Sequence, residues 1–406
     1  MSRGWTSART IIYNTPQVNT LKKPLQKNAK SDRAPGRRAL LVGVVLPGQP
    51  GFVVEEHLDE LRELASSAGV AVVGRAVQGR KAPDAATFVG SGKAEEIAAQ
   101  ARLLGAELLI FDDDLSGSQW KNLEQATELS VLDRSSLILD LFGQRARTRE
   151  ARTQVELARL NYMLPRLTRR WGHLSRQAGG VGTRGGEGEK QIEQDRRQLR
   201  HRIRRLEDDL KKIERTRGVQ RHGRRGVPEV ALTGYTNAGK STLWNRLTGG
   251  DTLAENRLFA TLDAKLRRGV IGALNGNGDG GVPETAVFAD TVGFIRKLPH
   301  HLVSSFRSTL GEITAADLVL HVVDRSHPRW REQAEVAEKV LADLGVEPGR
   351  VVLVFNKSDL VEPQEPRNGG LWVSATTGEG IPDLREEIAS RLDGRVENVS
   401  AATARR

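Results

Sequence analysis

The chain has 406 residues, of which 38% are hydrophobic, and this is enough for two or three domains with cores of their own. Because it contains no cysteine, a disulfide framework, a thiolate zinc site and a cysteine nucleophile are all excluded. The net charge of +11 is unevenly placed, since residues 144–226 hold 24 Lys and Arg against 10 Asp and Glu. Such a block predicts a polyanionic partner, most commonly nucleic acid. No apolar run is long enough to span a membrane, so we expect a cytoplasmic protein.

Residues 1–37 show no hydrophobic period and contain a single acidic residue, which predicts a basic disordered tail, with a cleaved presequence as the alternative. Residues 38–143 alternate short apolar runs with amphipathic patterns, which is typical of a small α/β domain built from βαβ units. The expected strands are 40–46, 70–77, 108–111 and 130–132, and the expected helices are 54–68, 93–104 and 116–127. The triplet Asp112–Asp114 is expected to be a solvated turn or a helix cap.

The basic block, residues 144–226, contains two long helical patterns at 144–167 and 190–217, which we expect to pack as an antiparallel hairpin. In the second, apolar residues alternate in spacings of four and three, which defines a heptad seam (Leu199, Ile203, Leu206, Leu210, Ile213). Pro165 is expected to end the first helix. The glycine-rich stretch 179–188 is expected to form the loop between them, because glycine disfavours helix.

A second α/β pattern occupies residues 227–394, and residues 395–406 are expected to be a tail. An apolar strand leads into Gly-x-x-x-x-Gly-Lys-Ser at 234–241, and a helical pattern follows at once. Glycines let the backbone N–H groups wrap phosphates, and the helix N-terminus adds partial positive charge.

We therefore expect Lys240 to reach the β- and γ-phosphates of a nucleotide and Ser241 to ligate Mg²⁺. The expected contacts of this loop with the nucleotide come from Gly234, Tyr235, Thr236, Asn237, Ala238, Gly239, Lys240, Ser241 and Thr242.

Two further elements point to the phosphates. Asp290-Thr-Val-Gly293 follows the apolar strand 286–289, so that the Asp290 carboxylate can hold Mg²⁺ and the Gly293 N–H can read a γ-phosphate. Thr261 lies between the loop and Asp290 in a polar stretch, where it is placed to be the switch threonine that closes on the metal and the γ-phosphate. The predicted metal ligands are Ser241, Thr261 and Asp290, and the predicted catalytic residues are Lys240, Thr261 and Gly293.

Two more elements point to the base. Asn356-Lys357-Ser-Asp359 follows the strand 351–355, and a carboxylate there can accept two N–H bonds from a guanine edge. A short strand precedes a backbone turn that can face the guanine oxygen (Ser374, Ala375, Thr376). All these elements in this order predict a GTPase domain with a mostly parallel sheet, which binds GTP and GDP with Mg²⁺.

The same elements, with several long strings elsewhere, resemble the HflX family of ribosome-associated GTPases, which are related to the translation factors. The strings are Leu-Asp-Arg-Ser-Ser-Leu-Ile-Leu-Asp-Leu-Phe at 132–142, Gln-Arg-Ala-Arg-Thr-Arg-Glu-Ala at 144–151, Gln-Val-Glu-Leu-Ala-Arg-Leu at 154–160, Tyr-Met-Leu-Pro-Arg-Leu at 162–167, Gly-Gly-Val-Gly-Thr-Arg-Gly at 179–185 and Phe-Ala-Thr-Leu-Asp at 259–263. The resemblance covers about residues 38–394. It implies the order of N-terminal α/β domain, helical hairpin and GTPase domain, and it adds Phe259 to the nucleotide site.

The resemblance further implies binding to the large ribosomal subunit and its rRNA, with a role in splitting or rescuing stalled ribosomes. The hairpin is the expected RNA surface, with arginines and a tryptophan near its tip as candidates (Arg169, Arg170, Arg176, Arg184, Trp171). Two features depart from the family. Residues 185–190 differ from the Gly-Pro-Gly-Glu-Thr string expected in many members, and a C-terminal domain that some members carry is expected to be absent.

Two alternatives remain open. One is a GTP-regulated protein scaffold that dimerises through the heptad seam, although the excess of basic residues suits RNA better and favours a monomer. The other is a basic, RNA-binding ATPase, against which the Asn356–Asp359 motif argues.

Two positions bear on the rate of hydrolysis. Asn237 occupies the position where some related GTPases hold K⁺, although it can equally bond within its own loop. Phe294 follows Gly293, where Ras-like proteins place the glutamine that orients water, so hydrolysis by the isolated protein is expected to be slow and partner-stimulated.

Overall fold

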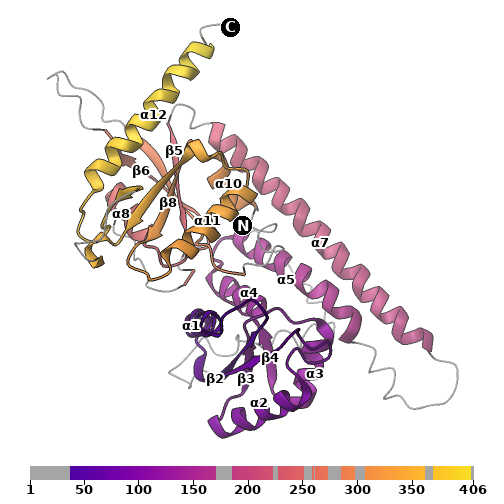
Figure 1. The fold of residues 1–406 in the computed structure, drawn as a ribbon. Coiled ribbons are helices and arrows are strands. Elements are labelled where there is room, and N and C mark those ends of the chain that lie inside the picture. The colour runs from indigo at the N-terminus through magenta and orange to yellow at the C-terminus, as the bar shows by residue number, and fades with distance from the viewer. Residues whose placement is uncertain are drawn as a thin grey trace, which may run out of the picture. The chain divides into compact units, whose positions relative to one another are not determined.

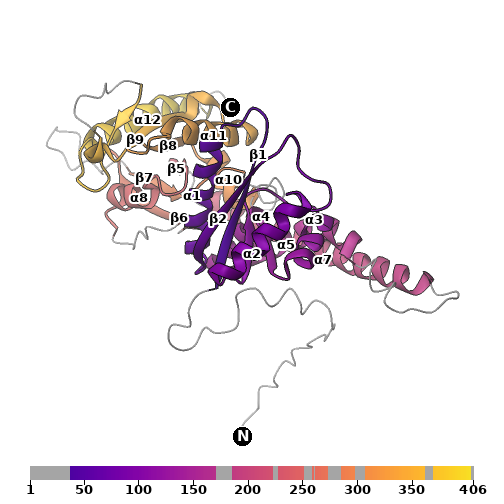
Figure 2. The same cartoon turned by 60° about the horizontal axis from the view of Figure 1, so that its bottom comes forward.

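The structure, a computed structural model, describes residues 37–170, 185–222, 227–250, 258–259, 261–272, 285–297, 307–361 and 369–403. The first of these segments begins with a four-stranded parallel sheet in the order β2-β1-β3-β4. The strands are β1 (Arg38–Val45), β2 (Ala71–Gly79), β3 (Leu108–Phe111) and β4 (Ser130–Asp133). The helices that accompany them are α1 (Gly51–Ser67), α2 (Ser91–Leu104) and α3 (Gly117–Thr127) (Figures 1 and 2).

The two faces of this sheet are covered by different helices. Leu40, Val42 and Val44 of β1 join a buried apolar cluster with residues of α2 and α3. Gly43, between them, points to the opposite face, because successive residues of a strand alternate. There it lies so close to α1 that an added Cβ would come within 2.8 Å of Val54.

Helix α4 (Arg134–Arg145) begins directly after β4, where we expected no helix. It is capped by Asp133, whose carboxylate accepts the Ser136 N–H at 2.9 Å while the Ser136 hydroxyl contacts the Asp133 backbone in return. Its apolar stretch, residues 137–142, is almost continuous, so it lacks the spaced pattern by which an amphipathic helix is recognised.

Two long helices follow, α5 (Arg149–Arg170) and α7 (Gly185–His222), and they pack side by side (Figures 1 and 2). Their ion pairs run in opposite directions along the chain, since Arg202 contacts Glu156 whereas Arg217, further on, contacts Glu150. Leu157 of α5 packs against the predicted seam of α7 (Ile203, Leu206, Leu210 and, partly buried, Ile213). The two helices therefore pack antiparallel, with four of the five expected seam residues, all except Leu199, in the apolar cluster between them.

Three local expectations were wrong. Pro165 does not end α5, which continues to Arg170; the Arg166 side chain donates to the Tyr162 carbonyl at 2.9 Å on the turn that the proline interrupts. Glycines 185, 186 and 188 belong to α7 and not to a loop, because extending a long helix at about 1 kcal/mol per glycine is easier than nucleating one. Asp112 is buried in ion pairs rather than solvated.

The rest of the chain forms a six-stranded sheet in the order β10-β9-β8-β5-β7-β6, parallel except for β6. Its strands are β5 (Glu229–Gly234), β6 (Lys265–Val270), β7 (Thr285–Asp290), β8 (Leu318–Asp324), β9 (Val351–Asn356) and β10 (Leu371–Trp372). The helices are α8 (Lys240–Thr248), α10 (Arg307–Ala315), α11 (Trp330–Asp343) and α12 (Ile381–Thr403), with 3-10 turns at Pro348–Arg350 and Ser358–Leu360.

Helices pack on both faces of this sheet. One apolar cluster joins β5 and β8 to α8 and α12, through residues such as Leu243 and Ile388. Another joins Val323 and Phe355 to Ala334 of α11. The predicted fold class, an α/β chain with a mostly parallel nucleotide-binding sheet, is confirmed. Helix α12 continues through residues 395–403, where we expected a tail.

Within the described residues, none of the helices combines the length and the apolar character needed to cross a membrane.

Candidate active site

The loop Gly234–Ser241 connects β5 to α8 and depends on two glycines. Gly234 has φ +142°, and an added Cβ would lie 2.1 Å from the Val322 carbonyl oxygen. Gly239 has φ +87°, and its Cβ would lie 2.2 Å from the Asn356 amide nitrogen. Any side chain at these two positions would clash, so the loop follows its tight path only because glycine stands there.

Lys240 is buried at the start of α8, with its ammonium group folded back onto the loop. Its Nζ donates to the carbonyl oxygens of Tyr235 at 2.7 Å and Gly234 at 3.2 Å. Burial lowers the pKa of Lys240 to about 8, although the negative charge of Asp290 works in the opposite direction. Gly293 also lies close to this ammonium group, since an added Cβ at Gly293 would come within 2.9 Å of the Lys240 Nζ.

The three predicted metal ligands converge beside Lys240. The hydroxyls of Ser241 and Thr261 donate to the same oxygen of Asp290, at 2.7 and 2.9 Å, and lie 3.1 Å from each other. The other oxygen of Asp290 is buried and has no hydrogen-bond partner among the described residues. Burial raises the pKa of Asp290 despite these hydroxyls and Lys240. An unsatisfied carboxylate oxygen next to two hydroxyls fits a hard divalent cation that takes oxygen ligands.

The segment after Asp290 is paired with the phosphate loop by its backbone. Phe294 donates its N–H to the Gly234 carbonyl at 2.9 Å and accepts the Thr236 N–H at 2.7 Å. The Phe294 side chain is almost fully buried, so the ring offers no group to a water molecule at this point. Gly293 is held directly against Thr236, whose Cα would be 2.9 Å from an added Cβ.

The predicted base-recognition elements are linked to the phosphate loop through one asparagine. The Asn356 amide donates to the Ala238 carbonyl at 2.9 Å and accepts the Ala375 N–H at 3.0 Å. It therefore joins the loop, the strand β9 and the turn at residues 374–376 into one rim. Asp359 is exposed next to this rim, in the first turn of the 3-10 helix Ser358–Leu360.

Two supporting residues, Asp324 and Arg246, were not predicted. Lys357 has φ +64° and donates to Asp324 at 2.6 Å. Arg246 donates to the carbonyls of Ala375 at 3.3 Å and Thr376 at 2.6 Å, and Ser374 is buried beneath this turn. Asp324 could have been predicted to lie near the site, because it ends strand β8 and polar residues that end parallel strands collect at one edge of the sheet.

The remaining predicted residues lie at the border of the site. Asn237 is exposed with φ +62°, a left-handed conformation that asparagine tolerates, so the backbone alone explains its presence. Thr242 is half-buried in α8, and Phe259 is buried. Of the tip candidates, Trp171, Arg176 and Arg184 lie outside the described residues, as do the side chains of Arg169 and Arg170.

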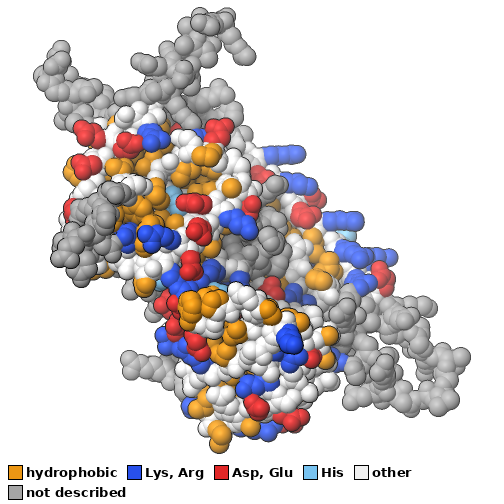
Figure 3. Space-filling view, viewed as in Figure 1, with side chains coloured by type: hydrophobic (Ala, Val, Ile, Leu, Met, Phe, Trp, Pro, Cys, Tyr) orange, Lys and Arg blue, Asp and Glu red, His pale blue; other side chains and the backbone are white. Residues whose placement is uncertain are grey.

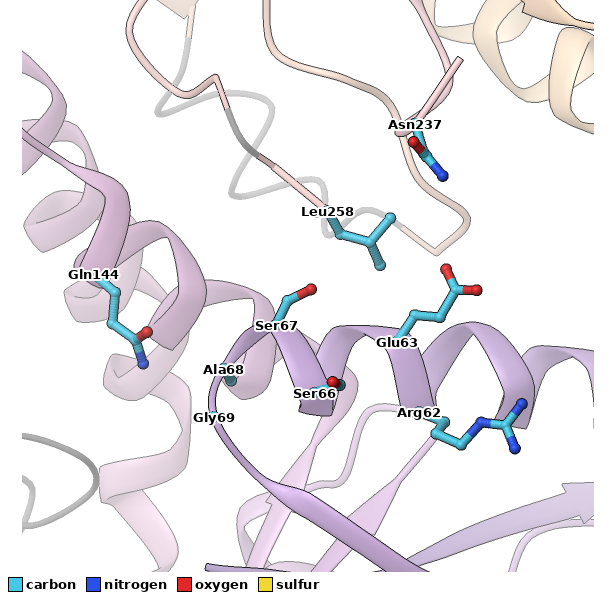
Figure 4. A pocket seen from close by; sticks show the side chains of 9 residues that line it. All are labelled: Arg62, Glu63, Ser66, Ser67, Ala68, Gly69, Gln144, Asn237 and Leu258. Carbon is cyan, nitrogen blue, oxygen red and sulfur yellow. The ribbon is translucent and has the colours of Figure 1, made fainter. Parts of the chain in front are cut away.

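A cavity of about 760 Å³ opens beside the phosphate loop (Figure 4). Asn237 and Leu258 line one side of it, and residues from the end of α1, among them Glu63 and Ser67, line the other. Burial, and then the charge of Glu60, raise the pKa of Glu63. Nothing in the sequence pattern of α1 indicated that this helix borders the phosphate loop.

The class of protein that these features define is a P-loop GTPase. The features are the glycine-dependent loop, the buried lysine, the converging oxygen donors and the rim that Asn356 links to the loop. Three family models match the chain: "GTP-binding GTPase N-terminal" at residues 55–143, "GTP-binding GTPase Middle Region" at 145–224 and "50S ribosome-binding GTPase" at 229–357.

Relatives called GTPase HflX match most of the chain. The protein from Escherichia coli K12 is 45% identical over 371 residues, which cover 89% of this chain and 84% of the relative. The one from Caldanaerobacter subterraneus subsp. tengcongensis is 44% identical over 366 residues, covering 89% and 82%. The chain therefore belongs to the HflX family of GTPases, and it is a GTP-hydrolysing enzyme.

Among solved structures, the chain is similar to a GTP-binding protein from the archaeon Sulfolobus solfataricus in complex with GDP. That similarity has a TM-score of 0.44 at 22% identity and covers 87% of this chain and 98% of the other.

Proposed function

We propose that this GTPase uses GTP with Mg²⁺ to control its binding to the large ribosomal subunit and its rRNA, and that it splits or rescues stalled ribosomes. Ser241, Thr261 and Asp290 would hold the metal, which when bound supplies positive charge to the phosphate oxygens. Lys240 and the loop N–H groups bind the phosphates, and Asp359 selects guanine. The description of the matching family model as a 50S ribosome-binding GTPase supports this partner.

The observation that carries the proposal is the exposed basic surface of the hairpin. Its seam is turned inward, so the charged residues of α7 are left on the outside, where Figure 3 shows Lys and Arg side chains along this helix. Exposed basic residues of α7 are Arg197, Arg200, Arg202, Arg204, Arg205, Lys211, Lys212 and Arg215. A row of this kind suits the phosphates of RNA, whose binding weakens steeply with salt through counterion release.

The same packing speaks against the scaffold alternative. A dimer through the seam would need Ile203, Leu206 and Leu210 to be available, but these residues are buried against Leu157 of the same chain. The ATPase alternative has less support, because the Asn356–Asp359 motif suits guanine and the exposed Asp359 carboxylate can accept N–H groups from a guanine edge.

Hydrolysis by the isolated chain is proposed to be slow. Phe294 is buried and its backbone is bonded to the phosphate loop, so no side chain at this position orients the attacking water. Ribosome binding would order the segments around Thr261 and Gly293 so that the attacking water is positioned. We also propose that K⁺ beside Asn237 contributes to the rate of hydrolysis. Equal single-turnover rates in KCl and NaCl at matched ionic strength would remove the potassium part.

The test is co-sedimentation with purified small and large subunits, with GDP or a non-hydrolysable GTP analogue, together with single-turnover hydrolysis. We expect binding to the large subunit in the GTP-analogue state and a rate that rises with added subunit. A protein that sediments with neither subunit, or that already hydrolyses GTP quickly alone, would contradict the proposal.

A further inference from the structure

The segment that carries Thr261, here the switch I segment (described residues Leu258, Phe259 and Thr261–Asp263), contacts two separate parts of the molecule. On one side Thr261 donates to Asp290 in the candidate metal site. On the other side Phe259 contacts the end of α4, and Asp263 contacts the residues that join α4 to α5. That junction is the base of the hairpin, so one short segment lies between the metal site and the proposed RNA-binding element.

Asp263 bonds to the two residues that directly precede α5. Its carboxylate accepts the backbone N–H groups of Arg147 at 3.4 Å and Thr148 at 3.3 Å, and it also accepts the Thr148 hydroxyl. The Thr148 hydroxyl oxygen in turn accepts the Ala151 N–H at 3.0 Å. Thr148 thus caps α5, and a side chain from the GTPase domain anchors this capping residue, at a place where an N-terminal helix end attracts negative charge.

Phe259 holds the junction from the other side of Thr261. Its ring meets Phe142 of α4 edge to face, with centroids 4.6 Å apart, and both rings are buried. Its backbone has φ +55°, a left-handed conformation that costs a bulky residue about 1–3 kcal/mol. Such strain persists only where surrounding contacts determine the conformation, and here the aromatic contact with α4 is that determinant.

The base of the hairpin is also tied to a second part of the GTPase domain. Arg217 of α7 contacts Glu150 of α5 at 2.8 Å and the buried Glu312 of α10 at 3.2 Å. Helix α5 is about 33 Å long, and because it packs against α7 we expect the two helices to behave as one rigid unit. Arg147 and Thr148 lie at the base of this pair and bond to Asp263, two residues from Thr261, so these bonds are a path by which a displacement of the pair can reach Thr261.

We propose that Phe259 and Asp263 are positioning residues that link the hairpin to Thr261, so that RNA contact along the hairpin sets Thr261 in the metal site. This inference rests on the proposed function. Linkage requires the effect to be reciprocal, because a nucleotide that draws Thr261 to the metal must change the hairpin's affinity for its partner by the same factor. The described hydrogen bonds of Asp263 go to Arg147 and Thr148 and not to the residues assigned to the metal or the phosphates, so the link can be cut while the proposed binding groups are kept.

The test variants are Asp263→Ala, which removes the acceptor that anchors the capping residue Thr148, and Asp263→Asn, which keeps one oxygen acceptor there. Ser116→Ala is the matched control, because it removes the cap of α3, where Ser116 accepts the Gln119 N–H at 3.2 Å far from the switch I segment in sequence. Large-subunit affinity is measured for each variant with GDP and with the non-hydrolysable GTP analogue.

For the native chain we expect the analogue to change subunit affinity by about 5- to 150-fold, the usual range of coupling between sites. Asp263→Ala should bring this ratio close to one while its nucleotide affinity stays within about twofold, and Asp263→Asn and Ser116→Ala should retain the ratio. An unchanged ratio in Asp263→Ala would overturn the link, and so would an equal loss in Ser116→Ala or an equal loss of affinity in both nucleotide states.

A second measurement needs no ribosome, which separates failure of the link from failure of the proposed function. Hydrogen exchange at the first turn of α5, including the Ala151 N–H, should differ between GDP and the GTP analogue in the native chain. The difference should vanish in Asp263→Ala and remain in Asp263→Asn. Protection that is the same in both nucleotide states of the native chain would refute the link even if ribosome binding is found.

Discussion

The two parallel sheets of this molecule both end in acidic residues at their carboxyl edges, yet the two edges differ in how those acids are satisfied. In the N-terminal sheet, Asp112 contacts Arg134 at 2.6 Å and Lys297 at 2.6 Å. Asp133, the last residue of β4, accepts the Ser136 N–H at 2.9 Å and the Tyr162 hydroxyl at 2.6 Å. These carboxylates have partners supplied by the protein itself.

In the nucleotide-binding sheet, Asp290 has both of its hydroxyl partners on one oxygen and none on the other, which is buried. The pKa values of Asp112 and Asp290 are shifted in opposite directions, as this difference in partners predicts. Burial would raise the pKa of Asp112, but His57, Arg134 and Lys297 outweigh it and hold the pKa well below its usual range. For Asp290, burial prevails and the pKa is raised. We call the first a saturated edge, because its acidic residues have protein partners that help to hold the fold together. The second is an unsaturated, ligand-ready edge, because one buried carboxylate oxygen still lacks a partner among the described residues.

The largest expected effect comes from breaking the saturated edge. Arg134→Met would remove one charged partner from the buried Asp112 and from the partly buried Glu60, both of which contact Arg134. We expect a loss of about 3–5 kcal/mol in the free energy of unfolding, with little change in nucleotide affinity at temperatures where the variant is folded. Urea unfolding and nucleotide titration measure the two quantities, and a stable variant would show that these pairs do not hold the fold.

A substitution at the ligand-ready edge should weaken nucleotide binding and leave the stability of the fold unchanged, which is the opposite of the result expected for Arg134→Met. Lys240→Ala removes the ammonium group that lies against the phosphate loop, so we expect triphosphate binding to weaken by at least about 100-fold, or roughly 3 kcal/mol. Stability should not fall, because a buried charge is removed. Calorimetric titration with GTP checks the affinity, and retention of tight binding would remove Lys240 from the site.

A smaller effect is expected at the rim of the site. Asp359→Asn exchanges an acceptor for a donor at the proposed guanine contact, and GTP affinity should fall about 10- to 100-fold while the stability of the exposed position is unchanged. Titrations with GTP, XTP and ATP test the base assignment. We expect XTP to gain relative to GTP, and identical preferences in the native chain and the variant would contradict the assignment.

The smallest effect is a proton count that reports on Lys240. Its pKa is about 8 in the nucleotide-free protein, and phosphates would raise it, so binding near pH 8.5 should take up part of one proton. Without nucleotide, the free energy of unfolding should rise with pH above about 8, because the unfolded lysine still binds the proton that the folded one has released. Calorimetry in two buffers of different ionisation enthalpy measures the uptake, and Lys240→Arg, which stays charged, should show none.

The phosphate loop and the strand-end residues could be predicted because each is a local pattern: an apolar strand, then a glycine or an acid at its end. Helix α4 could not, because its apolar residues 137–142 form a run without a period. Asp112 was misjudged for a related reason. A strand-end acid looks the same in sequence whether water or a buried arginine faces it, and Arg134 stands 22 residues away.

The sequence by itself therefore determined the fold class, the nucleotide and the family, since parallel strands bring their carboxyl ends to one edge and the spacing of each motif is short. Only the tertiary structure decided which acids are satisfied and how the domains are joined. Asp263 and Thr148 are 115 residues apart, and Tyr235 donates to Glu60 at 2.6 Å across 175 residues. Contacts of this kind arise from packing between separate elements, and no local spacing of residues encodes them.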